Sequence, residues 1–380
     1  MLYQSCDNSN ATAPTLDDIL AEMPKNETII NNIIKGWSII NSPKYEKICC
    51  TISGGSDSDV VLDICHKLDI NKKIIYCCFI TGLEYKANMR HLDDLEAKYG
   101  IHIHRIRPKI PVPLAVKRYG QPFLDKNASE NMQRLQKVGF QWEDKDFDTL
   151  VAQYCREYPK EKATTKNGTI KHGYVLHNSK YYRGAYNALA WWCNEKGENS
   201  RFNIDEKKHL KEFIIANPPQ FKISNKCCYY SKKKIIAELI VGEIEELGSF
   251  DLIISGVRKY EGGCRKTAYK NCFTSDKIKK HKGNSLIYSE YRPIFFYKQA
   301  DKREYIKHCN VECSDCYTVY GLSRTGCIGC CYGQHWEDEL IAAQMYEPDM
   351  YTAACNLFKD SYQYMRMYAE FRNKWNYILR

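Results

Sequence analysis

An apolar run at residues 47–52 is followed at once by a turn of small residues and then by apolar residues at helical spacing from residue 60 to residue 68. The turn consists of Ser53, Gly54, Gly55, Ser56, Asp57 and Ser58. Adjacent glycines permit positive φ and a close backbone approach, while hydroxyls and the N–H groups of a helix N-terminus donate hydrogen bonds. A strand, a glycine turn and a helix in this order predict a phosphate-binding loop.

Asp57 is unexpected in such a loop because a carboxylate repels a phosphate. Its presence predicts either a magnesium ion between carboxylate and phosphate, or a cap on the first helical turn. The chain contains no Gly-x-x-x-x-Gly-Lys-Ser/Thr sequence, and no lysine follows the two glycines directly. The loop therefore differs from the mononucleotide-binding motif of kinases and GTPases.

The residues after the loop continue an alternation of strands and helices. Apolar runs at residues 74–80 and 101–106 enclose a helical pattern that Gly100 ends. This β-α-β-α-β order predicts an α/β fold with a doubly wound, mainly parallel sheet, in which ligands bind beyond the carboxyl ends of the strands. Thr81, Gly82 and Glu84 fall at one such strand end, where Thr81 and Gly82 by themselves would form a plain turn.

A further apolar strand at residues 251–255 leads into Gly256, Arg258, Glu261 and Arg265. Arginine suits an anion site because its fixed fork of donors pairs with phosphate or sulfate in a bidentate way. The alternative interpretation is a surface ion-pair cluster of Arg258, Glu261 and Arg265.

Cysteine is abundant, with 19 in 380 residues, but falls short of a disulfide scaffold, and the amino terminus lacks a basic secretory signal. We therefore expect reduced thiols in the cytoplasm. No uncharged stretch approaches the roughly 20 apolar residues of a membrane helix, so no membrane partner is expected. Cysteines within the strands, at residues 49, 50, 77 and 78, are expected to be buried.

Other cysteines are spaced as metal ligands. Cys313-x-x-Cys316 and Cys327-x-x-Cys330 lie ten residues apart and have the pattern of a tetrahedral zinc knuckle. Cys227 and Cys228 are adjacent, which is awkward for tetrahedral zinc. Iron–sulfur, zinc and no metal at all remain alternatives, because soft thiolates suit both metals and geometry decides between them.

Four separated elements resemble the phosphoadenosine phosphosulfate (PAPS) reductase family of the adenine nucleotide α-hydrolase superfamily, whose members hold ATP or a sulfonucleotide. They are the Ser53–Ser58 loop, Thr81-Gly82-x-Glu84, the Gly256–Arg265 segment and the two cysteine pairs, and they span roughly residues 45–335. The resemblance implies that the loop, Thr81, Gly82, Glu84, Gly256 and Arg258 bind an adenine nucleotide. Gly262 stands where the family has serine, so this chain lacks the hydroxyl of that serine.

The same resemblance implies a [4Fe-4S] cluster held by Cys227, Cys228, Cys327 and Cys330. It also suggests a reaction. Reductases of the family carry a cysteine near the carboxyl terminus in a Glu-Cys-Gly-x-His segment, which this chain lacks; Cys355 has no such neighbours, and Cys331 is an alternative nucleophile. This absence favours the ATP-using branch, in which adenylation releases pyrophosphate and sulfur transfer follows.

In that branch Asp57 would bridge Mg²⁺, and Arg258 or Arg265 would hold the departing pyrophosphate. The first alternative is a sulfonucleotide reductase that releases sulfite and uses thioredoxin. The second is a non-catalytic nucleotide-binding module associated with defence. A sulfur donor protein and a homodimer are further partner hypotheses.

Breaks in the pattern suggest an organisation. We expect an N-terminal arm or helix at residues 1–40, an α/β domain at 41–335 and a helical region at 336–380. The α/β domain would contain an insertion at about 110–226 and cysteine segments at 224–234 and 309–331. The insertion includes an expected helix at 181–194, whose Trp191 and Trp192 either belong to a core or stack a substrate base.

The net charge of +10 is modest and spread along the chain. Lysine-rich stretches at residues 160–171, 207–211, 232–234 and 277–282 predict either contacts with nucleic-acid phosphates or a solvated surface.

Overall fold

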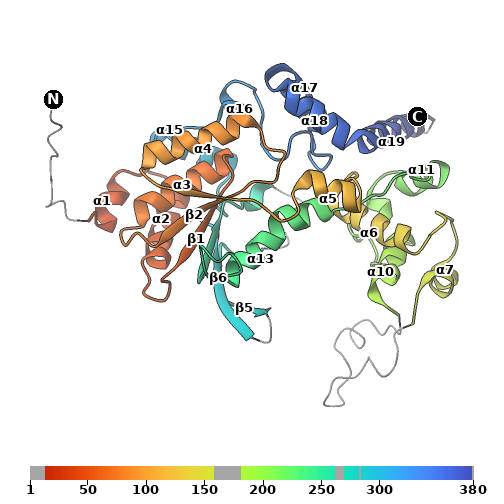
Figure 1. Ribbon diagram of the computed structural model, residues 1–380, viewed down its shortest axis with the longest axis horizontal. Coiled ribbons are helices and arrows are strands. Elements are labelled where there is room, and N and C mark those ends of the chain that lie inside the picture. Colours follow the sequence, from red (N-terminus) through yellow and green to blue (C-terminus); the bar gives the residue numbers. More distant parts are fainter. Residues whose placement is uncertain (1–12, 158–180, 262–268, 282–283, 379–380) are drawn as a thin grey trace, which may run out of the picture. The chain divides into compact units, whose positions relative to one another are not determined.

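A computed structural model describes residues 13–157, 181–261, 269–281 and 284–378 (Figure 1). The chain forms two compact units, and each is built from separate stretches of sequence. Unit 1 comprises residues 1–109 and 231–327, and unit 2 comprises residues 110–230 and 328–380. The expected insertion and the expected C-terminal helical region thus belong to one unit. Arg265, Gly262 and the lysine-rich stretch at 160–171 lie outside the described residues.

Unit 1 is organised around a six-stranded sheet with strand order β3-β2-β1-β4-β6-β5. All neighbouring strands pair in parallel except β5 and β6, which pair antiparallel at one edge. The α/β fold with a mainly parallel sheet is therefore confirmed. The strands are β1 (Ile48–Ile52), β2 (Ile74–Phe79), β3 (Ile103–Ile106), β4 (Leu252–Ser255), β5 (Phe273–His281) and β6 (Asn284–Tyr291).

Four of these strands match the apolar runs in the sequence, whereas β5 and β6 were not expected. The sequence does not indicate β5, because lysines at 277, 279 and 280 interrupt the apolar pattern of this charged edge strand. The β5–β6 pair also contains a bulge between Thr274 and Lys277, where Asp276 has a φ of 52°.

Helices cover both faces of the sheet, as a doubly wound fold requires. Successive residues of a strand point to opposite faces, so Cys50 faces the larger core and Cys49 the smaller one. The larger core contains Ile33 of α2 and Val61 of α3, and the smaller one contains Leu239 of α13. The helices of unit 1 are α1 (Leu16–Ala21), α2 (Glu27–Ile40), α3 (Ser56–Leu68), α4 (Lys86–Tyr99), α13 (Lys234–Ile240), α15 (Gln299–His308) and α16 (Asp315–Thr318).

Unit 2 is helical and has its own aromatic core. Trp191 and Trp192 are 1% and 0% exposed and pack among core residues that include Phe213. These tryptophans are therefore core residues and are not available to stack a substrate base. The α-helices are α5 (Val112–Tyr119), α6 (Lys126–Lys137), α7 (Phe147–Tyr154), α10 (Arg183–Trp192), α11 (Leu210–Ala216), α12 (Lys226–Cys228), α17 (Trp336–Tyr346), α18 (Pro348–Leu357) and α19 (Lys359–Ile378).

The strand order also identifies the edge of the sheet at which doubly wound folds bind ligands. The chain moves from β1 to β2 to β3 in one direction across the sheet, whereas β4 lies on the opposite side of β1. The strand order reverses at this point, and doubly wound folds bind ligands in the crevice at such a reversal. The loop after β1 and the segment after β4 both lie there. Among the described residues, no helix is long and apolar enough to cross a membrane.

Candidate functional site

The Ser53–Ser58 loop is a tight turn whose shape is maintained by Ser58. The Ser58 hydroxyl accepts hydrogen bonds from the N–H groups of Ser53 and Gly55 at 3.2 and 3.1 Å and donates to the Gly55 carbonyl at 2.7 Å. Gly54 has a φ of 66°, and a β-carbon there would lie 3.1 Å from the carbonyl oxygen of Asn88. Glycine is therefore required at residue 54 for both conformation and space.

Asp57, at the start of α3, is held between two cationic side chains. Arg258 donates from Nε to Asp57 Oδ2 at 2.9 Å, and Lys302 Nζ lies 2.8 Å from Asp57 Oδ1. Lys302 also donates to the Ser56 hydroxyl at 3.0 Å. Both cations are nearly buried, with 7% of Arg258 and 5% of Lys302 exposed. Two positive charges and a helix N-terminus therefore meet at the loop, an arrangement that favours an anion.

The segment after β4 approaches the loop closely. A β-carbon at Gly256 would lie 3.2 Å from the Asp57 carbonyl oxygen, so glycine allows the two backbones to meet. The next turn is fixed by Glu261, whose carboxylate accepts a hydrogen bond from the Arg258 N–H at 3.2 Å. Glu261 thus orients Arg258, which points inward to Asp57. Arg258 is accordingly buried in an ion pair with Asp57 and does not belong to an exposed ion-pair cluster.

The turn after β2 is closed by its own glutamate. The Glu84 carboxylate accepts hydrogen bonds from the N–H groups of Thr81 and Gly82, the latter at 3.0 Å. The Thr81 hydroxyl and the Cys327 thiol share a hydrogen bond of 3.4 Å. The segment that carries Cys327 therefore lies at the carboxyl end of β2.

A tyrosine and a threonine from the same region line the loop. The hydroxyls of Tyr317 and Thr325 are hydrogen-bonded at 3.1 Å. A β-carbon at Gly55 would lie 3.2 and 3.1 Å from these two oxygens. Burial raises the pKa of Tyr317, and hydrogen bonds from Thr325 and from the Ser56 backbone oppose this change. Tyr317 therefore interacts with the helix terminus where an anion would bind.

A buried carboxylate and imidazole lie behind the loop. His91 Nε2 is 3.2 Å from Asp59 Oδ2, and both side chains are almost inaccessible. Burial raises the pKa of Asp59, and His91 opposes the shift. Burial alone would lower the pKa of His91, but the hydrogen bond and charge of Asp59 raise it. Burial also raises the pKa of Cys313 to about 11, with small contributions from Asp59 and Asp57.

The cysteines of the described residues are all reduced. Within unit 2, burial and then the nearby thiols of Cys227, Cys228 and Cys330 raise the pKa of Tyr332. These three thiols therefore act on one tyrosine, and their soft sulfur chemistry suits an iron–sulfur cluster. In the described parts of the chain, however, no three His, Cys, Asp or Glu side chains have the geometry to hold a metal ion. The iron–sulfur and zinc hypotheses stay predictions.

Three residues at the loop have no sequence motif. Lys302 lies on α15 and belongs to no recognisable sequence motif. Its contact with Asp57 is apparent only once α15 packs against α3. His91 is identified by its buried contact with Asp59. Asn88 packs against Gly54 and is 4% exposed, and its Oδ1 has no hydrogen-bond partner among the described residues. An unpaired buried acceptor is costly, so a ligand donor at Asn88 would be favourable.

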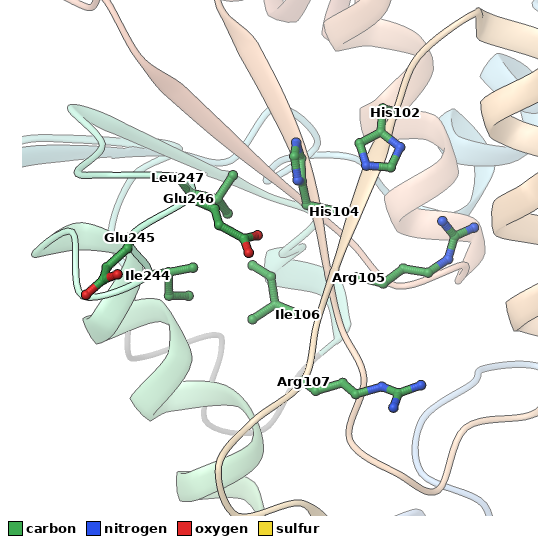
Figure 2. Close-up of a pocket in the computed structure, with 9 residues that line it drawn as sticks. All are labelled: His102, His104, Arg105, Ile106, Arg107, Ile244, Glu245, Glu246 and Leu247. Carbon is green, nitrogen blue, oxygen red and sulfur yellow. The ribbon is translucent and has the colours of Figure 1, made fainter.

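A cavity of about 590 Å³ lies elsewhere in unit 1. Figure 2 shows His104 and Ile106 on the side of β3 that faces residues 244–247. Those residues precede β4, whereas the Ser53–Ser58 loop follows the carboxyl end of β1. The cavity contains none of the residues predicted from the sequence to form the site, and it is separate from the loop.

One family model matches most of the chain, and two known proteins are similar to it. The phosphoadenosine phosphosulfate reductase domain family matches residues 47–332. An uncharacterised protein of Methanocaldococcus jannaschii is 30% identical over 169 residues, which are 43% of this chain and 33% of that relative. The chain thus spans about one third of the length of that relative. A crystal structure of phosphoadenylyl-sulfate reductase from Candida auris, in a phosphate complex, is 11% identical with a TM-score of 0.34 and covers 83% of this chain and 96% of its own.

Proposed function

Because the chain belongs to the phosphoadenosine phosphosulfate reductase family, we propose that it is an enzyme that binds ATP at the Ser53–Ser58 loop and transfers its adenylate. One observation carries the proposal. Arg258 and Lys302, from distant parts of the sequence, converge on Asp57 at the N-terminus of α3. Burying two cations is expensive unless they have an anionic partner, and the phosphates of a nucleotide are a second such partner.

Each residue at the loop has a distinct role in the proposed adenylation step. Lys302 and Arg258 bind the phosphates, and the N-terminus of α3 stabilises negative charge that develops at the α-phosphate. An oxygen of the acceptor attacks the α-phosphorus, the bond from this phosphorus to the bridging oxygen breaks, and pyrophosphate leaves with the electron pair. Lys302 and Arg258 balance the charge of the departing pyrophosphate. Asn88 accepts a hydrogen bond from the nucleotide.

The sequence predicts that Asp57 either binds Mg²⁺ or caps the first helical turn. Each of its carboxylate oxygens already has a cationic neighbour within 2.9 Å. A third cation at this carboxylate would be repelled, so no step of the proposed reaction depends on Mg²⁺ at Asp57. Magnesium that arrives bound to the triphosphate remains compatible with the site.

The second half of the proposed reaction transfers sulfur. The terminal sulfur of a donor protein's persulfide attacks the activated acceptor, the bond to the adenylate oxygen breaks, and AMP leaves. A second thiol then attacks the donor's sulfur, so the S–S bond breaks, the transferred sulfur stays on the acceptor as a thiol, and the donor and the second thiol form a disulfide. The family resemblance suggests that Cys227, Cys228, Cys327 and Cys330 would hold a [4Fe-4S] cluster, which would supply an iron able to bind sulfur.

Reduction of a sulfonucleotide is the second candidate, since the family includes sulfonucleotide reductases. It needs a nucleophilic thiol. Cys331 is 1% exposed, and burial raises its pKa far above the ordinary value, so it is a poor nucleophile. Cys355 is half-buried on α18. A defence module that binds nucleotide without turnover is the third candidate, because the same loop would serve it.

Three measurements on the anaerobically purified full chain test these candidates. Pyrophosphate release from ATP in the presence of Mg²⁺ and a nucleic-acid acceptor is expected for the proposed enzyme. Sulfite release from phosphoadenosine phosphosulfate with thioredoxin, abolished by Cys355→Ser, would instead identify a reductase. Calorimetric ATP binding without either product would identify a nucleotide-binding module. If the folded protein neither bound ATP nor released pyrophosphate, the proposal would be wrong.

A further inference from the structure

Two exposed aromatic side chains lie on the segments that carry Arg258 and Lys302. Tyr260 is 58% exposed and lies in the 3-10 turn Lys259–Glu261, directly after Arg258. Phe296 is 47% exposed and lies on the segment that leads into α15 and Lys302. The Lys259 N–H donates to the carbonyl of Phe295 at 2.9 Å, which holds the two segments side by side. Both rings are therefore displayed on segments that also supply the phosphate-binding side chains.

The exposure of Phe296 is selective. Its neighbours Phe295 and Tyr297 are both fully buried, so this segment contributes those two side chains to the core and leaves only the ring of Phe296 exposed. Leaving a large apolar ring in water gives up the free energy that its burial would contribute. A single exposed ring is ordinary. Two exposed rings on adjoining segments beside a candidate reaction centre indicate a binding surface.

Lysines accompany the two rings. Lys259 and Lys298 are exposed, and Lys298 Nζ lies 6.0 Å from the centroid of the Tyr260 ring. The nearby carboxylates are engaged by backbone donors. Glu261 accepts from the Arg258 N–H, and Asp301 accepts from the Lys298 N–H at 2.7 Å. The surface therefore presents two aromatic faces and two ammonium groups to solvent.

We infer that Lys259, Tyr260, Phe296 and Lys298 form a binding surface for single-stranded nucleic acid. Aromatic rings interleaved with lysines are what single strands require, because unpaired bases stack on the rings while lysines contact the phosphates. A duplex offers no exposed base faces, so this surface discriminates against it. The inference rests on the proposed function, since it identifies the acceptor that receives the adenylate.

The test measures the affinity of the full-length protein for fluorescein-labelled single-stranded DNA and RNA of one sequence by anisotropy. Tyr260→Ala and Phe296→Ala are each expected to weaken binding by about 5- to 150-fold, the loss of one stacked base. Phe202→Ala is the matched control, because Phe202 is 48% exposed and its ring lies beneath Arg201, with 4.9 Å between guanidinium and ring centroid. This control should bind as the unaltered protein does.

Salt dependence tests the lysines independently. Each phosphate contact with a single strand contributes about 0.7 to the slope of log K against log salt concentration. Replacing Lys259 and Lys298 together with alanine should therefore reduce the slope by about 1.4. An unchanged slope would contradict their assignment to the strand.

ATP binding separates failure of this inference from failure of the proposed function. All these variants should bind ATP like the unaltered protein, because none of the replaced side chains contacts Asp57. If the unaltered protein binds ATP but neither oligonucleotide, or if both ring variants bind the strand normally, the inference is wrong while the proposed function stands. Loss of ATP affinity in the ring variants would assign the rings to the nucleotide and overturn the inference. Absence of ATP binding in the unaltered protein would contradict the proposed function.

Discussion

Replacing Lys302 with methionine tests the central feature of the site. Methionine retains most of the length and volume of lysine but removes the charge that lies 2.8 Å from Asp57 Oδ1. In the proposed enzyme the same ammonium binds a phosphate of ATP. Lys302→Met should therefore weaken ATP binding and also loosen the Ser53–Ser58 loop, because Lys302 donates to Ser56 as well.

The two effects have different expected sizes. A hydrogen bond to a charged group contributes about 1.5–3 kcal/mol, so the dissociation constant for ATP should rise about 10- to 150-fold. In the variant Asp57 still forms its ion pair with Arg258, and its side chain is 20% exposed, so it is not left as an isolated buried charge. The free energy of unfolding should therefore fall by about 1–3 kcal/mol, less than the 3–5 kcal/mol that is typical when a buried pair is broken.

Isothermal titration calorimetry with ATP and thermal unfolding measure the two quantities separately. Lys307→Met on the same helix is the control, because Lys307 is exposed and should change neither. Asp57→Asn combined with Lys302→Met completes a double-mutant cycle, which isolates the coupling between the two side chains. A folded Lys302→Met protein with unchanged ATP affinity would refute the assignment of Lys302 to the phosphates.

Three further predictions concern the surroundings of the loop. Gly256→Ala should lower the unfolding free energy by about 1–3 kcal/mol and weaken ATP binding, because the added β-carbon would lie 3.2 Å from the Asp57 carbonyl oxygen. Gly184→Ala is the control, because a β-carbon there has open space, and it should change neither stability nor ATP affinity. The pKa of His91 in the folded protein lies above its ordinary 6.5, so the stability from its pair with Asp59 is complete below pH 6.5 and is lost as pH rises through the raised pKa. Melting temperatures should therefore decline over that pH range. If an Asp59→Asn, His91→Gln protein showed an equal decline, this account would be contradicted. Cys227→Ser should lower the iron content and the visible absorbance of the anaerobically purified protein, and the control Cys155→Ser should change neither. If the protein instead contained zinc and Cys313→Ser lost it, the zinc knuckle would be favoured.

The sequence predicts most of the sheet because local pattern and tertiary structure agree there. The runs at 47–52 and 74–80 are apolar enough to be buried on both faces, and the glycine turn marks the end of β1. The tight turn after β1 also forms where the glycines predict it, because Gly54 has positive φ, and its role in binding phosphate stays a prediction. The confirmed family follows from these motifs.

Features that depend on distant packing were beyond sequence reasoning. Lys302 has no local signature, and its role emerges only when α15 lies against α3. The structure adds that the side chains of Ser58 and Glu84 bond to the backbone of their own turns, and their contact with a nucleotide stays a prediction. Trp191 and Trp192 could be assigned to a core only once Phe213 and the rest of unit 2 were seen around them.

The irregular outer strand β5 has a consequence for the solution behaviour of the protein. A strand at the rim of a sheet exposes unpaired backbone groups that can recruit another chain and start aggregation. Here the bulge at residues 274–277 interrupts the regular spacing that an incoming strand would need, and lysines at 279 and 280 project to opposite sides. These lysines oppose fibril-like stacking, so shortening or neutralising this strand to aid crystallisation would sacrifice solubility.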